Sequence, residues 1–254
     1  MAASQEAILL KGDVLFNRLL NGAYQGFVDL NAGALSIKMN SKQLDAISKG
    51  RANYGMPRAT AILPEPSDLT LEFNKASPKA LAMGLQGSVT AFTQAAGAAV
   101  DEVHTAAKGG WMDMTFRNMT AAGLAVKNSA GAVTYVKDTD YTVDYVAGQI
   151  FVLPTSAITD GQSLKVSYTY NAVTAESIKG GTQASVRGII HMKGQNVFAD
   201  DAQVEIKIWD AVLTSESAID WLSEKPIDIK LKGRMVIPEG RPEPFEILTN
   251  FTNS

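Results

Sequence analysis

The chain has 254 residues, of which 46% are hydrophobic, enough for one large folded domain or two small ones. It has no cysteine and only two histidines, which excludes disulfides, thiolate nucleophiles and cysteine-based metal centres and argues against a histidine-rich metal site. It has 23 Lys and Arg and 26 Asp and Glu, and the resulting net charge of −3 argues against a protein that binds nucleic acid through its phosphates.

The N-terminal part of the chain predicts one helix and one strand. Residues 1–10 lack the basic and apolar regions of a secretory signal, so none is expected. A helix is predicted over about 41–49, with Leu44 and Ile47 on one side. Alternation of apolar and polar residues predicts a strand over 69–73.

A second helix is predicted to start at Ser77 and Pro78, because serine is a favoured N-cap and proline a favoured first helical residue. The uncharged run 80–100 is long enough to cross a bilayer. It is dominated by Ala and Gly and carries Gln, Ser and Thr, so its transfer into lipid is too weak for a spanning helix. We therefore expect no membrane partner.

The second half of the chain predicts mostly strands. Apolar and polar residues alternate in several segments, and a turn at 147–148 would join the first two of them into a hairpin. These segments are 141–145, 149–153, 164–170, 204–208 and 227–231. A third helix is predicted over 214–223. The pattern predicts a mainly β fold, a sandwich or barrel with short flanking helices.

Prolines and glycines divide the chain. The proline-rich stretches 64–66 and 238–244 are predicted to be loops, because proline cannot donate to a strand ladder. Lys-Gly-Gly sequences start at Lys108 and Lys179, on either side of a β-rich block. We therefore expect a main domain formed by 1–107 and 179–254, interrupted by a β-rich insertion at 108–178.

Candidate chemical groups are few and isolated. His104 lies near Asp101 and Glu102, where a solvated charged cap is a simpler interpretation than a general acid–base pair. Asp138 and Asp140 resemble the start of a calcium loop, but the glycine and glutamate that such a loop needs are missing. His191 lies in a strand-like run without an identifiable catalytic partner. No catalytic, cofactor-binding or metal-binding residue is assigned, and we expect neither a cofactor nor an enzyme.

Read from end to end, the order of segments resembles the major tail tube protein of long, non-contractile bacteriophage tails. The family's opening strand would correspond to 10–15, and its next strand and short helix to 69–73 and 77–87. Its closing part would be a strand at 204–210, a helix that ends near Trp221 and a strand at 229–233. The insertion segments 140–150, 160–161 and 166–170 are similar to β modules of phage tail proteins. The proline-rich stretch 238–244 departs from the pattern.

The resemblance implies a tail-tube-type β fold and a virion structural protein without catalysis. Members of this family form homohexameric rings that stack into a tube, through which DNA and the tape-measure protein pass. The implied partners are other copies of the chain, the tape-measure protein and the tail terminator. DNA would pass without specific binding, and the protein would lie in the phage tail, having been in the host cytoplasm before assembly.

The long unpatterned region 50–58 is a candidate for ring stacking. Tyr54, Met56 and Arg58 are residue types favoured at interfaces, and we hypothesise that this loop becomes ordered only when rings stack. An ordinary surface loop is the alternative. For the whole chain the alternatives are another ring-forming tail component, such as a tail terminator or baseplate hub, and a carbohydrate-binding β-sandwich, which would expose an aromatic platform.

Overall fold

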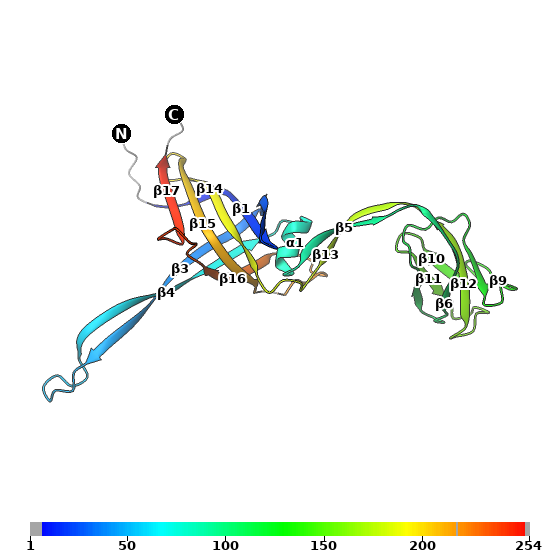
Figure 1. Ribbon diagram of the computed structural model, residues 1–254, viewed down its shortest axis with the longest axis horizontal. Helices are drawn as coiled ribbons and strands as arrows, with labels where there is room; N and C mark the ends of the chain where they lie inside the picture. The colour runs from blue at the N-terminus through cyan, green and yellow to red at the C-terminus, as the bar shows by residue number, and fades with distance from the viewer. Residues whose placement is uncertain (1–6, 217, 252–254) are drawn as a thin grey trace. The chain divides into compact units, whose positions relative to one another are not determined.

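The protein, described for residues 7–216 and 218–251 in a computed structural model, is built almost entirely of antiparallel strands (Figure 1). The prediction of a mainly β fold is confirmed. The chain forms two compact units: unit 1 comprises Met1–Val89 and Ile178–Ser254, and unit 2 comprises Thr90–Ser177. Strands β5 (Ser88–Gln94) and β13 (Val173–Lys179) pair with each other where the chain leaves one unit and returns to it.

Unit 1 contains an eight-stranded sheet with the order β2-β1-β14-β15-β16-β4-β3, and β17 pairs with β15 beside this path. Its elements are β1 (Leu10–Leu20), β2 (Ala23–Asp29), β3 (Ala32–Ile47), β4 (Pro57–Phe73), α1 (Pro78–Gly84), β14 (Val186–Asn196), β15 (Ala202–Ser215), β16 (Ile229–Met235) and β17 (Phe245–Phe251). Strand β15 is divided: residues 203–208 pair with β17, and residues 211–215 pair with β16.

One face of this sheet encloses the core of unit 1. Alternate residues of each strand turn inward, as the period of two requires, and the buried set includes Phe16, Leu69, Leu71, Phe73, Ile190, Ile208, Leu213 and Leu231. Burial of these side chains is the main stabilising contribution to the unit. Helix α1 contributes Ala80 and Met83 to the same core.

Helix α1 confirms the predicted helix start. The Ser77 hydroxyl accepts a hydrogen bond from the Ala80 backbone N–H at 3.2 Å, and Pro78 occupies the first turn. The helix packs very closely against β16, because a Cβ added at Gly84 would lie 2.7 Å from Ile229 Cγ2. Glycine at this position therefore lets the helix approach the strand.

The other two predicted helices are wrong. Residues 41–49 lie mostly in β3, where Leu44 is opposite Ala61 of β4, so the spacing of Leu44 and Ile47 does not reflect a helical face. Residues 214–215 end β15, and the described residues 218–223 contain no helix. In both cases long-range strand pairing overrides a weak local pattern.

The predicted loop at 64–66 is also wrong, because Pro64 and Pro66 lie within β4. Strand β16 pairs with β4 only at 68–73, so among the described residues β3 alone pairs with the preceding part of β4. An edge strand tolerates proline, since the N–H groups on its open side need no partner in the sheet. The second proline-rich stretch, 238–244, is a loop between β16 and β17, as predicted.

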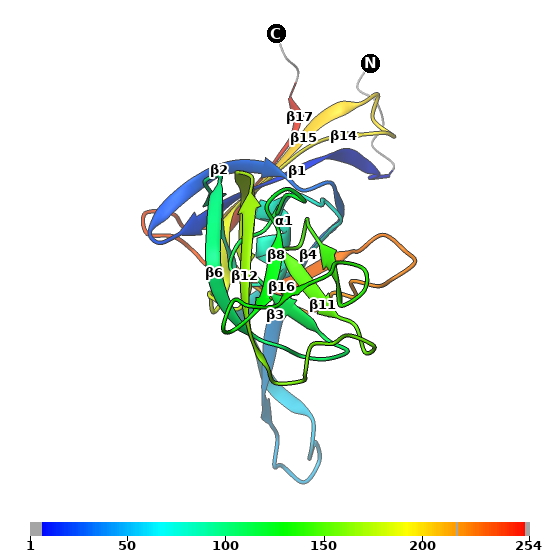
Figure 2. The same ribbon diagram turned by 90° about the vertical axis from the view of Figure 1, so that its right-hand side faces the viewer.

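Unit 2 has a core of its own between two small sheets, with orders β10-β11-β7 and β6-β12-β8-β9 (Figure 2). Its strands are β6 (Gly97–Thr105), β7 (Trp111–Asp113), β8 (Ala125–Asn128), β9 (Thr134–Tyr135), β10 (Tyr141–Asp144), β11 (Gln149–Val152) and β12 (Ser163–Tyr170). The predicted hairpin is formed by β10 and β11. The unit starts at Thr90, ahead of the expected position 108, because β6 pairs along β12.

Within the described residues, no helix is long and apolar enough to cross a membrane. The uncharged run 80–100 is divided among α1, β5 and β6.

Candidate assembly surfaces

The residues predicted for ring stacking lie together at the end of a long hairpin. Strands β3 and β4 continue beyond the rest of the sheet as a two-stranded extension, residues 41–64, which we call the arm (Figure 1). Residues 48–58 at its end form the tip. Tyr54 and Met56 are 78% and 65% exposed there, and Arg58 is also exposed.

The backbone of the tip is held by its own hydrogen bonds. The N–H of Ser48 donates to the Met56 carbonyl at 2.8 Å, and the N–H of Gly55 donates to the Ser48 carbonyl at 3.0 Å. The Ser48 hydroxyl donates to Asn53 Oδ1 at 2.7 Å. This network exists in the single chain and argues against ordering only on ring stacking, which stays a prediction.

One face of the arm is largely apolar, and Ile62 adds an exposed apolar side chain to the other face. Residues directly opposite each other in an antiparallel pair share a face, and Leu44 is opposite Ala61 while Lys42 is opposite Leu63. Ala46 and Ala59 complete this face, which is exposed along its length. A two-stranded hairpin with an exposed apolar face is only marginally stable in water, so this arm favours a covering partner.

The sequence did not predict this face, because the spacing of Leu44 and Ile47 indicated a helix over 41–49. The signal that could have found it is two short strand-like runs, the alternating polar and apolar residues 43–46 and the apolar-rich residues 59–63. Two such runs around the glycines of the tip are typical of a hairpin.

Strands β2, β3 and β17 of unit 1 each have an open edge, and that of β3 belongs in part to the arm. Along the first part of β15 the strand order is β17-β15-β14-β1-β2, so β17 and β2 lie at opposite margins of the same sheet. Among the described residues, no strand pairs with the outer side of either one. Open edges of this kind can continue a sheet into a neighbouring chain.

The outer face of the same sheet carries charges of both signs, together with the apolar side chains of Leu15, Phe27 and Leu248. Because Ile190 and Ile208 point into the core, His191, Lys193, Glu205 and Lys207 lie on the opposite face. Glu205 contacts His191, and Lys207 Nζ lies 2.9 Å from Glu205 Oε1. The hydrogen bond from Lys207 lowers the pKa of Glu205, and burial lowers the pKa of His191. The face therefore carries compensated charges.

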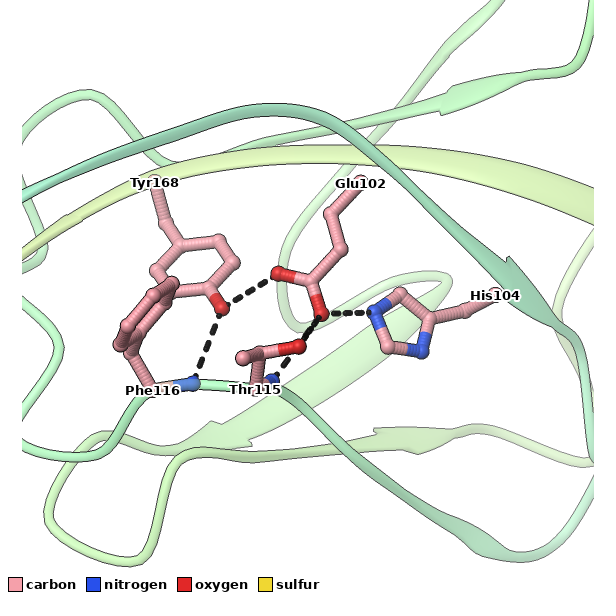
Figure 3. Close-up of polar contacts among 5 residues, drawn as sticks. All are labelled: Glu102, His104, Thr115, Phe116 and Tyr168. Atoms are coloured by element: carbon pink, nitrogen blue, oxygen red, sulfur yellow. Dashed lines mark hydrogen bonds and ion pairs between the residues drawn. The ribbon is translucent and has the colours of Figure 1, made fainter.

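Unit 2 contains a polar cluster centred on Glu102 (Figure 3). Its carboxylate accepts hydrogen bonds from the Tyr168 hydroxyl at 2.5 Å and from the Thr115 hydroxyl and N–H at 2.5 and 3.0 Å. His104 Nε2 lies 2.9 Å from the same carboxylate. Burial raises the pKa of Glu102, but the hydrogen bonds from Thr115 and Tyr168 outweigh it and leave that pKa below its ordinary value.

This arrangement corrects the expectation of a solvated cap around His104. Glu102 instead ties β6 to β12 and to the segment after β7, with its acceptor positions occupied by protein groups. Such a carboxylate stabilises the unit, and it has little capacity left to act as a general base. Asp140 is likewise a structural anchor, accepting from the N–H groups of Val136 and Ala157 at 2.9 Å each.

No set of three or more His, Asp or Glu side chains among the described residues could hold a metal ion. The three tryptophans differ in their surroundings. Trp209 is half-buried beneath Arg241, whose guanidinium carbon lies 3.5 Å from the ring centroid. Trp111 and Trp221 are exposed, and Trp111 contacts Phe151 with ring centroids 5.2 Å apart.

Residues 7–242 match a family described as "Protein of unknown function UCP028589", and the chain therefore belongs to this family. The match covers both units. No curated protein matches the sequence significantly.

Proposed function

We propose that this member of a family without an assigned function is a virion structural protein that forms homohexameric rings, stacked into the tube of a long, non-contractile phage tail. The observation that carries the proposal is the arm, whose exposed apolar face and exposed tip extend beyond the sheet of unit 1. A hairpin that buries neither of these in its own chain is suited to contact other copies.

Ring formation would use the open edges of β2 and β17. If β2 of one copy lies beside β17 of the next, the contact is heterologous, because different surfaces meet. Heterologous contacts close into a ring when a whole number of copies completes one full turn, as six copies do when each is rotated by one sixth of a turn. The edges are then covered, which removes an aggregation hazard.

In such a ring the outer face with His191, Glu205 and Lys207 would line the lumen, since the opposite face is filled by the core. Mixed and paired charges suit a conduit, because a strongly basic wall would hold DNA by its phosphates. DNA and the tape-measure protein would pass through, and a tail terminator would cap the tube. The protein would act without catalysis, first in the host cytoplasm and then in the virion.

Negative-stain microscopy of the purified protein tests this function. We expect rings and tubes from the wild-type chain, and rings without long tubes from the Tyr54→Ala, Arg58→Ala variant, because the tip loses its one aromatic side chain and one of its cations. Arg117→Ala with Val146→Ala, both exposed in unit 2, is the matched control and should form normal tubes. Monomers at high concentration under every salt condition would refute the proposal. Single rings that never stack would favour a tail terminator or baseplate hub.

Glycan binding by unit 2 is a second candidate function, favoured by the contact between Trp111 and Phe151. Asp113 and Gln149 lie on the same sheet face two residues away, joined by a hydrogen bond of 2.7 Å. A sugar ring can stack on the aromatic pair while its hydroxyl groups bond to these polar side chains. A glycan array with wild type and Trp111→Ala tests it, and equal signals from both chains would exclude this site.

A further inference from the structure

The tip of the arm is basic as well as exposed. Residues 48–58 contain Lys49, Arg51 and Arg58 and no carboxylate, although the whole chain has a net charge of −3. All three side chains are exposed, and none forms an ion pair within the described part of the chain. Tyr54 and Met56 lie between these cations in the sequence, so the tip combines exposed apolar and exposed positive side chains.

A loop of opposite character joins β15 to β16. We call residues 218–228 the acidic loop. It carries three carboxylates, Asp220, Glu224 and Asp228, against one ammonium, that of Lys225, a net charge of −2. None of these four groups forms an ion pair among the described residues.

The acidic loop also presents large apolar side chains to solvent. Trp221 is 58% exposed and Leu222 is 94% exposed. They are flanked by Ile219 and Ile227, which pack on the core of unit 1. Because both ends of the loop are anchored in this way, its backbone holds Trp221 and Leu222 outward.

We propose that the tip of one copy docks on the acidic loop of a second copy in the adjacent ring, an inference that rests on the proposed tube function. Two exposed apolar residues stand on each side, with three cations facing three carboxylates. An apolar centre with a complementary charged rim is typical of specific interfaces, in which the charges select the partner and its orientation.

The contact also has the symmetry that a tube needs. No hydrogen bond or ion pair joins tip and loop within the described chain, so each copy offers both surfaces. Because the contact joins two different surfaces, every stack of rings has free tips at one end and free acidic loops at the other. Stacking can then continue without limit along the axis.

Charge reversal tests the contact. The tip variant is Lys49→Glu with Arg51→Glu, and the loop variant is Glu224→Lys with Asp228→Lys. These four side chains make no hydrogen bond or ion pair in the described structure, so both variants should fold and form rings, measured by circular dichroism and light scattering. We expect each variant alone to lose tubes and to stop at rings. Glu176→Lys with Glu239→Lys, which changes the charge elsewhere by the same amount and sign as the loop variant, should leave tubes unchanged.

Mixing the two ring-forming variants separates this inference from the function on which it rests. A reversed tip then faces a reversed loop, and a native tip faces a native loop, so we expect tubes of alternating rings. If either variant alone formed tubes like those of the wild-type chain, or if the mixture stayed as rings, the docking contact would be overturned and the tube function would stand. A wild-type chain that forms neither rings nor tubes would overturn both.

Discussion

At the scale of single residues, Glu102 is the shared acceptor of a hydrogen-bonded cluster in unit 2. It accepts hydrogen bonds from Thr115 and Tyr168 and contacts His104 (Figure 3). Hydrogen bonds to an ionised group stabilise more than neutral ones, so the cluster contributes most when Glu102 is charged. The stability of unit 2 should therefore depend on the ionisation of this one carboxyl group.

We expect Glu102→Gln to destabilise the protein by about 2 kcal/mol at pH 7, because an amide leaves donors of Thr115 and Tyr168 without a charged acceptor. The folded pKa of Glu102 lies below its ordinary value of 4.5. Its stabilising contribution is thus complete above pH 4.5 and is lost as the pH falls through the folded pKa. Urea unfolding at pH 7 and pH 3 should show the difference between wild type and variant shrinking in acid.

The control for this prediction is Glu176→Gln, which removes an exposed carboxylate of unit 2 and should change stability by less than about 0.5 kcal/mol. A deficit of the Glu102 variant that is the same at both pH values would mean that lost packing, rather than lost charge, is responsible.

The sequence indicated that His104 lies near Glu102, but it did not indicate Thr115 and Tyr168, which donate the hydrogen bonds that lower the pKa of Glu102. Thr115 and Tyr168 are 13 and 66 residues away from Glu102, and only the pairing of β6 with β12 brings Tyr168 close. Likewise, the residue types of Tyr54, Met56 and Arg58 indicated a contact surface, whereas their position at the end of an arm depends on the register of β3 and β4.

At the scale of elements, local signals were enough for α1 and for the β10–β11 hairpin. Ser77 and Pro78 act within one turn, and the turn at Gly148 joins neighbouring strands. The arm was missed for the opposite reason: its two strands stabilise each other across the tip, and neither has a buried face of its own. Prolines in β4 strengthened the error, since the sequence alone does not show which edge is open.

The contact between α1 and β16 gives a prediction at this scale. Gly84→Ala places a methyl group 2.7 Å from Ile229 Cγ2 and 3.3 Å from Ile219 Cδ1. The overpacking cost of about 1–3 kcal/mol exceeds the gain of up to about 1 kcal/mol from removing a helical glycine. We therefore expect a lower urea midpoint by circular dichroism.

Gly33→Ala is the matched control for that variant, because nothing lies within 4 Å of the added methyl group. Its midpoint should be close to that of the wild-type chain. If Gly84→Ala were as stable as this control, the helix would have room to move away from β16, and its packing would be looser than the structure indicates.

At the scale of the whole molecule, the two units have separate cores, and each encloses its own set of buried side chains. Composition and strand patterns predicted a β-rich segment within a main β domain. The structural start of unit 2 could not be read from the sequence, because 90–107 contains no break and its assignment depends on the pairing of β6 with β12.

The chain enters and leaves unit 1 through adjacent strands, which leads to a prediction about unit 2. A Cβ added at Gly87 would lie 2.3 Å from the Lys179 carbonyl oxygen, and the N–H of Gly181 donates to the Leu85 carbonyl at 2.9 Å. Replacing residues 90–177 by a Gly-Ser linker of about four residues, an ordinary hairpin length, should therefore close the chain without strain.

We expect this shortened chain to fold and to form tubes with the same inner diameter as the full chain, because the arm, the acidic loop and the open edges of β2 and β17 belong to unit 1. Circular dichroism and negative-stain microscopy measure the two outcomes separately. A folded chain that forms no tubes would show that unit 2 takes part in assembly. An unfolded chain would show that unit 1 depends on unit 2 despite having a core of its own.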